Sequence, residues 1–156
     1  MRVAKLSSSA RIGRANRNRI SKKSVTSTVD RCCLPSALSE APSVVTVDLG
    51  ERSYPIYIGS GLLDDGDLIR KHVPGRTALV VTNETIAPLY LDRTVAALES
   101  KGDLRVEVII LPDGEKYKTV DVLMKIFDKA LESKLDRQTT FVALGGGVIG
   151  DMTGFA

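Results

Sequence analysis

Three glycines near the end of the sequence have the spacing of a phosphate-binding turn. Gly145, Gly147 and Gly150 fit the pattern G-x-G-x-x-G, in which the glycines permit a tight turn, close approach of a diphosphate and close helix packing. An apolar run over residues 139–144 precedes them, and apolar residues resume at Met152. The segment therefore predicts a strand, a tight loop and a helix start whose N–H groups attract a diphosphate. A glycine turn that binds no ligand is the alternative.

Polar side chains in two other loops have the chemistry to bind a ribose or a phosphate. The loop over residues 113–118 reads DGEKYK and is more charged than a turn requires. Its carboxylates can accept ribose hydroxyls, and its lysines can pair with a phosphate, although a solvated face is the alternative for Lys116 and Lys118. Asn83 offers both a donor and an acceptor to a ribose. Asp151 would repel a diphosphate, so we expect it to face ribose hydroxyls.

Histidine and cysteine give no sign of a metal or redox site. The only histidine, His72, precedes Val73-Pro74-Gly75, where a helix is predicted to end, and we expect it at the surface. One histidine cannot build a histidine-rich metal site. Cys32 and Cys33 are adjacent and lack the C-x-x-C spacing of zinc or thioredoxin-like sites.

Strands are predicted where apolar and β-branched residues run together. Two such runs, 44–49 and 54–58, flank a turn over residues 50–53 and predict a hairpin, with Pro55 at an edge or among the first residues of its strand. Three further runs lie at 77–82, 104–111 and 139–144. The run at 77–82 is nearly continuous, as expected for a strand covered on both faces of a parallel sheet.

Helices are predicted between these strands from apolar residues at helical spacing. They run from Leu62 to Ile69, from Ile86 to Leu98, and from the N-cap candidate Thr119 to Leu131. Pro88 falls in the early turns of the second helix, where it could kink the helix. Asn83 and Thr85 offer capping side chains to the same helix.

This alternation predicts the fold class. Strands and helices joined by short connections favour right-handed crossovers and a parallel sheet covered by helices. We therefore predict an α/β protein, a Rossmann-like parallel sheet with flanking helices plus an N-terminal β-hairpin. Ligands of such sheets bind at the carboxyl ends of the strands. The loops that leave those ends are 83–85, 112–118 and 145–151.

The first part of the chain differs from the rest in charge. Residues 1–40 hold nine Lys or Arg and two acidic residues, so the overall charge of +3 conceals an acidic body. The leader is rich in serine and has no acid before Asp30, which is typical of an organelle transit peptide. We expect a disordered transit peptide over residues 1–42 and the α/β domain over 43–156. A nucleic-acid-binding arm is the alternative function of this leader. No apolar run is long enough to span a bilayer, so we expect no membrane partner.

Three motifs, in order, resemble one enzyme family. Residues 81–90 (VTNETIAPLY), 111–118 (LPDGEKYK) and 143–156 (ALGGGVIGDMTGFA) are similar to the 3-dehydroquinate synthases of the shikimate pathway. The resemblance covers roughly residues 44–156. It also agrees with a leader, since in plants this pathway is plastidic.

The resemblance implies an activity. Members convert 3-deoxy-D-arabino-heptulosonate 7-phosphate to 3-dehydroquinate and phosphate, in the biosynthesis of chorismate and aromatic amino acids. They use NAD as a transient hydride acceptor and a divalent metal, zinc or cobalt. A homodimer, a sugar-phosphate substrate and a location in the plastid stroma are implied as well.

Carried onto matching positions, the resemblance implies a set of NAD contacts, with Asn83, Glu115 and Lys118 around the adenosine ribose. The full set is Asn83, Asp113, Gly114, Glu115, Lys116, Tyr117, Lys118, Gly146, Gly147, Val148, Ile149, Gly150 and Asp151.

The family's metal ligands and substrate contacts lie beyond the last matching motif. No catalytic or metal residue is therefore expected up to Ala156, and the family's C-terminal helical domain is expected to be absent. We expect an N-terminal fragment that binds NAD weakly and has no cyclase activity by itself.

Three alternatives remain. Metal-dependent alcohol and glycerol dehydrogenases resemble this fold, but they carry serine and lysine where this chain has Val148 and Gly154. Other sugar-phosphate cyclases share the glycine loop more closely. A non-catalytic nucleotide-binding module is the third.

Overall fold

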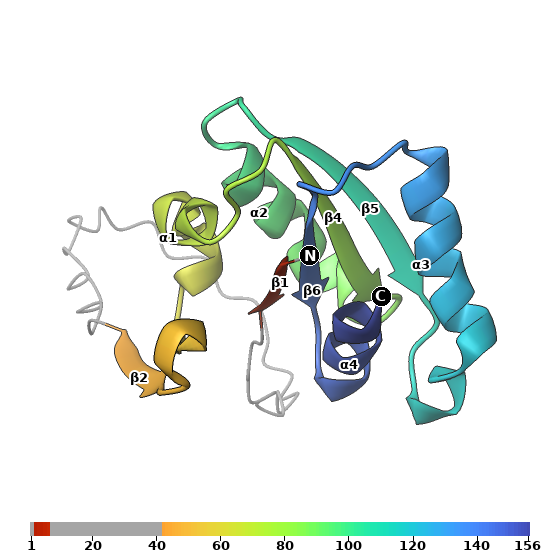
Figure 1. Cartoon of the computed structure of the whole chain (residues 1–156), viewed down its shortest axis with the longest axis horizontal. Coiled ribbons are helices and arrows are strands. Elements are labelled where there is room, and N and C mark those ends of the chain that lie inside the picture. The colour runs from red at the N-terminus through yellow and green to blue at the C-terminus, as the bar shows by residue number, and fades with distance from the viewer. Residues whose placement is uncertain (1, 7–41) are drawn as a thin grey trace, which may run out of the picture.

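A parallel sheet is the centre of the structure, a computed structural model that describes residues 2–6 and 42–156 (Figure 1). Its strand order is β1-β6-β4-β5, and each neighbouring pair is parallel. The strands are β1 (Arg2–Leu6), β6 (Thr140–Leu144), β4 (Thr77–Asn83) and β5 (Arg105–Leu111). The predicted Rossmann-like α/β class is confirmed.

Helices cover both faces of this sheet. Helices α1 (Gly66–Lys71) and α2 (Ala87–Glu99) bury Ile69 and Leu98 in one apolar cluster. Helices α3 (Val120–Glu132) and α4 (Gly147–Phe155) contribute to a second cluster on the opposite face. Successive side chains of a strand point to opposite faces, so β4 supplies both clusters and is buried almost throughout. The near-continuous apolar run at 77–82 predicted this two-sided burial of β4.

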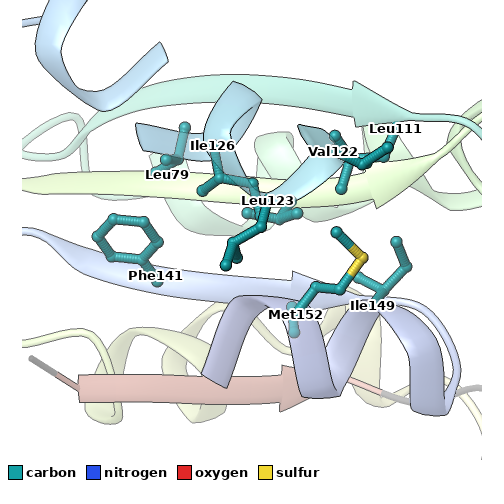
Figure 2. Close-up of a cluster of buried hydrophobic side chains, with 10 residues drawn as sticks. Leu79, Leu111, Val122, Leu123, Ile126, Phe141, Ile149 and Met152 are labelled. Atoms are coloured by element: carbon teal, nitrogen blue, oxygen red, sulfur yellow. The ribbon is translucent and has the colours of Figure 1, made fainter. Parts of the chain in front are cut away.

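The cluster under α3 and α4 is formed by side chains from every layer on that face (Figure 2). Leu79 and Phe141 come from the sheet, Ile126 from α3, and Ile149 and Met152 from α4. Burying a side chain of this size stabilises the fold by about 1.5–3 kcal/mol relative to leaving it exposed. This cluster fixes the start of α4 against the end of β6.

Capping side chains fix the starts of α1 and α3. Thr119 accepts a hydrogen bond from Val122 N at 3.4 Å and is the N-cap of α3, as predicted. Pro88 lies in the first turn of α2, where a missing N–H costs nothing, so the kink considered from the sequence is not required. The single helix predicted from Leu62 to Ile69 is wrong. Instead, a 3₁₀ turn covers Leu62–Asp64, and α1 begins separately after Asp65. Asp65 is the N-cap of α1, because its Oδ1 accepts a hydrogen bond from Leu68 N at 2.9 Å.

The predicted hairpin is confirmed as a separate two-stranded antiparallel ribbon. Strands β2 (Ser43–Val47) and β3 (Tyr54–Ile58) pair with Val45 opposite Ile56. The turn between them is held by Asp48, which accepts from Gly50 N at 3.1 Å. His72 lies at the C-cap of α1, as predicted, but it is half-buried, with its ring centroid 5.7 Å from that of Tyr57. The surface position predicted for His72 is therefore wrong.

Strand β1 was not predicted. Arg2–Leu6 pairs along β6, with Arg2 opposite Thr140 and Leu6 opposite Leu144. The rest of the proposed transit peptide, with Cys32 and Cys33, lies outside the described residues, and the boundary at residue 42 stays a prediction. Within residues 2–6 and 42–156, no helix has the length and apolar character needed to cross a bilayer.

Candidate functional site

The strand order creates a crevice at the carboxyl end of the sheet. From β4 the chain first moves to β5 on one side, and then returns past β4 to place β6 on the other side. The loops after β4 and β6 therefore leave in opposite directions. Doubly wound sheets bind their ligands at such a switch point. The topology alone thus selects the space between residues 83–86 and 145–149.

A cavity of about 230 Å³ lies at this switch point. Residues from all three predicted loops line it: Asn83, Thr85, Ile86, Asp113, Gly146, Gly147, Val148 and Ile149. One side is made of amide, hydroxyl and carboxylate groups, and the other of glycine backbone and aliphatic side chains. Such a mixture of apolar walls and a few convergent polar groups is typical of a cofactor site.

The glycine turn brings the start of α4 to this cavity. Gly145 has no side chain, and a Cβ there would lie 3.1 Å from both Cβ and Cγ1 of Ile149, so any larger residue would push Ile149 away from the turn. Gly146 is the N-cap of α4 and supplies no capping side chain. The first bond of the helix joins Gly150 N to Gly146 O at 3.0 Å. The N–H groups of residues 147–149 therefore precede the hydrogen-bonded ladder of the helix.

Space at these glycines matches a ligand that must approach the backbone. A Cβ added to Gly146 or Gly147 would meet no heavy atom within 4 Å. The first turn of α4 also contains no acidic residue. A helix start with open N–H groups, open space and no negative charge favours an anion. The structure thus fits the diphosphate of a dinucleotide at this turn.

Asn83 and Asp113 are brought together, as their places after neighbouring strands predicted. Asn83 Nδ2 donates to Asp113 Oδ1 at 2.6 Å, and Asn83 Oδ1 accepts from Ile86 N at 2.8 Å. Thr85 Oγ1 donates to Asp113 Oδ2 at 2.8 Å. Thr85 and Ile86 were missed as site residues by the sequence reasoning, although their position two and three residues after Asn83, at a strand end, was a usable signal.

The remaining charged loop lies beside the cavity and does not line it. Lys118 Nζ lies 3.1 Å from Asp151 Oδ2 and 3.7 Å from Glu115 Oε1, so it links the loop to α4. The hydrogen bond to Asp151, together with the charges of Asp151 and Glu115, raises the pKa of Lys118 above its ordinary value. The Lys116 ammonium lies 4.8 Å from the centroid of the Tyr117 ring. Gly114 and Gly150 are also outside the cavity lining.

A metal centre does not fit the part of the chain that the structure describes. It contains no group of three or more His, Cys, Asp or Glu side chains placed to hold an ion. His72 lies at the C-cap of α1, before β4 begins, whereas the glycine turn follows the end of the parallel strand β6. The aromatic neighbour of His72 is Tyr57. No step that needs a metal can be assigned to these residues.

The fold defines a class, the α/β proteins with a Rossmann-like parallel sheet covered by helices on both faces. Comparison with solved structures agrees with the fold. A 2-deoxy-scyllo-inosose synthase, in complex with carbaglucose-6-phosphate, NAD+ and Co2+, superposes with a TM-score of 0.60 over 72% of this chain and 31% of that one. At 19% sequence identity the likeness concerns the fold.

Sequence comparisons find similarity to one enzyme family. Residues 108–156 match the family model described as 3-dehydroquinate synthase N-terminal. The chain is 64% identical to the chloroplastic 3-dehydroquinate synthase of Solanum lycopersicum over 121 residues, which is 77% of this chain and 27% of that protein. Identity to the chloroplastic enzyme of Arabidopsis thaliana is 65% over 117 residues, 74% of this chain and 26% of that protein.

These matches confirm the resemblance inferred from the sequence: the chain is similar to the N-terminal part of 3-dehydroquinate synthases, those of plant chloroplasts included. It spans about a quarter of the length of these plant relatives.

Proposed function

We propose that this chain forms the NAD-binding part of a 3-dehydroquinate synthase. The observation that carries the proposal is the cavity at the switch point, where the uncapped start of α4 faces Asn83, Thr85 and Asp113. The N–H groups of residues 147–149 would hold the diphosphate, and the Asn83 and Asp113 side chains would bind ribose hydroxyls. When bound, NAD supplies a hydride acceptor.

The whole reaction is part of the same proposal. It converts 3-deoxy-D-arabino-heptulosonate 7-phosphate to 3-dehydroquinate and phosphate, in the plastid stroma, by a homodimer. The similarity to chloroplastic 3-dehydroquinate synthases supports it. The basic, serine-rich leader supports the plastid location, as a transit peptide.

This chain by itself is proposed to be inactive. The described residues offer no metal-ligand group, and the chain spans 27% of its tomato relative. Purified chain supplied with substrate, NAD and zinc is therefore expected to release no phosphate in a coupled assay. A complete plant 3-dehydroquinate synthase is the positive control. Turnover by the purified chain would contradict the proposed inactivity.

NAD binding is tested most directly by NMR, because we expect an affinity weaker than low micromolar. In a titration of the isotopically labelled chain, millimolar NAD is expected to shift the amide signals of residues 146–149 and the side-chain amide of Asn83. The amides of the β2–β3 hairpin serve as the internal control.

A matched variant removes the anion site without touching the core. Gly147→Asp places a carboxylate at the first residue of α4, where a Cβ meets open space. The fold should persist and the NAD-induced shifts should disappear, because the carboxylate repels a diphosphate. Equal shifts in the variant, or no shifts in the parent chain, would refute the proposed site.

A further inference from the structure

Asp113 is the centre of a hydrogen-bond network that joins two walls of the cavity. Its Oδ1 accepts from Asn83 Nδ2 at 2.6 Å and its Oδ2 accepts from Thr85 Oγ1 at 2.8 Å. Asn83 is the last residue of β4 and Thr85 follows that strand, whereas Asp113 follows β5. The main chains are joined at the same place, since Glu84 N donates to Leu111 O at 3.0 Å. The carboxylate is thus held by the loop of the neighbouring strand.

The network also fixes the direction of the Asn83 amide. Its Oδ1 accepts from Ile86 N at 2.8 Å, and its Nδ2 donates to Asp113. A rotation by 180° would set the amide oxygen against a carboxylate and the amide NH₂ against a main-chain N–H. Asn83 is only 7% exposed, so water could not replace the lost partners fully. The Asp113 carboxylate therefore determines which atom of Asn83 faces which neighbour.

Thr85 is the second support of that carboxylate. Asp113 is itself exposed. It is followed by Gly114, which has a φ of +120° and no side chain that could brace the loop. Among the described residues, Asn83 and Thr85 are the side chains that donate to Asp113. Without the Thr85 hydroxyl, one carboxylate oxygen would be left to solvent, and the side chain could rotate away from Asn83.

We infer that Thr85 is a positioning residue of the cavity. Its hydroxyl holds the Asp113 carboxylate, and the carboxylate holds the Asn83 amide in the direction needed for a ligand. The hydroxyl acts through Asp113 and not through a contact of its own with the dinucleotide. This inference rests on the proposed NAD site for its effect on binding, while its effect on Asn83 exists without ligand.

The first experiment measures NAD binding by NMR titration for Thr85→Val and Thr85→Ser. Valine keeps the shape and removes the donor, so the dissociation constant is expected to rise about 5- to 10-fold. Serine keeps the hydroxyl, so binding is expected to stay close to that of the parent chain. Thr46→Val is the matched control, because Thr46 is an exposed threonine of β2 in the hairpin.

A double-mutant cycle separates positioning from direct contact. In an Asp113→Ala background, Thr85→Val should have no further effect on NAD affinity, because the group through which it acts is gone. An undiminished loss in that background would overturn the inference and assign Thr85 a ligand contact. An unchanged affinity in the single Thr85→Val variant would overturn it as well.

A second readout needs no ligand. The side-chain amide signals of Asn83 are expected to move in Thr85→Val and to return in Thr85→Ser. Unmoved Asn83 signals in Thr85→Val would overturn the inference. If the parent chain fails to bind NAD, the proposed function fails, and the Asn83 signals still decide whether Thr85 positions the amide.

Discussion

Neighbouring glycines of the turn after β6 have different physical reasons to be glycine. At Gly145 a Cβ would lie 3.1 Å from Ile149 Cβ, so Gly145→Ala forces a rearrangement where α4 packs on the sheet. We expect a loss of about 1–3 kcal/mol in the free energy of unfolding, as for an overpacked core. Urea denaturation followed by circular dichroism measures it.

Gly147→Ala is the matched comparison. A Cβ at Gly147 meets nothing within 4 Å, and alanine is the better helix former. The free energy of unfolding should stay within about 0.5 kcal/mol of the parent value. If both variants are equally destabilised, the distinction between a packing glycine and a ligand-approach glycine does not hold.

The residue types and their positions predicted the location of the site, but they did not predict which side chains interact within it. Asn83, Asp113 and the 146–149 turn could be placed together, because strand ends of a parallel sheet share one edge. The pairing of Lys118 with Asp151 could not be predicted, since it depends on the directions of two side chains that are 33 residues apart in the sequence. Thr85 was seen only as a helix-capping candidate. The roles of the predicted residues as NAD contacts stay predictions.

At the scale of single elements, the start of α3 depends on one hydroxyl. Thr119 Oγ1 accepts from Val122 N at 3.4 Å. Thr119→Ala is expected to lower the free energy of unfolding by about 0.5–1 kcal/mol, because one N–H of the first turn loses its partner. Thr119→Ser keeps the acceptor and should behave like the parent chain in the same thermal denaturation. A serine variant as unstable as the alanine variant would show that the cap is not responsible.

Strand β5 and helix α3 are connected through Glu107. Its carboxylate lies 2.7 Å from Arg105 Nη2, 3.2 Å from Lys129 Nζ and 3.1 Å from Ser133 Oγ. Hydrogen bonds from Arg105, then Lys129 and Ser133, lower the pKa of Glu107. Glu107→Gln is expected to reduce the free energy of unfolding at pH 7 by about 0.5–1 kcal/mol, the range of partly exposed ion pairs.

The pH dependence of this effect has a definite sign. Because the folded pKa lies below the ordinary value of 4.5, the stabilisation is fully present above pH 4.5. It is lost as the pH falls through the lower folded pKa. Urea denaturation between pH 7 and acid should thus show the Glu107→Gln difference shrinking below that value. Glu132→Gln, at an exposed acid at the end of α3, is the control, and an equal response there would contradict the explanation.

Elements with a clear apolar period were predicted, and those that depend on one local contact were not. The strands at 77–82 and 139–144 and the amphipathic α3 follow from patterns that tertiary packing reinforces. The break at Asp65 could not be read from an apolar period, because it is decided by one side-chain cap. Strand β1 was not predicted, because it lies in the basic leader, whose composition is not typical of strands. Its position is determined by pairing with the edge of β6.

At the scale of the whole molecule, the α/β unit and the hairpin were both recognised from sequence, but their unequal burial was not. Strand β6 is buried at every position, as is β4 from Ala78 onward. In the hairpin, Val44, Val45, Tyr54, Ile56 and Ile58 are between 41% and 56% exposed. The apolar spacing of the hairpin strands indicated their pairing and gave no information about what they would pack against.

The unequal burial predicts two levels of local stability. A two-stranded ribbon is marginal in water by itself, and the hairpin's aromatic contact is the pair formed by Tyr57 and His72. Native-state hydrogen exchange should therefore show fast amide exchange in β2 and β3 and the slowest exchange in β4 and β6.

Tyr57→Ala should speed exchange in the hairpin and leave β4 unchanged, since the α/β core does not depend on that ring. Tyr54→Ala, a more exposed tyrosine of the same strand, is the matched control. Equal protection of hairpin and sheet, or loss of β4 protection in Tyr57→Ala, would show that the chain unfolds as one cooperative unit.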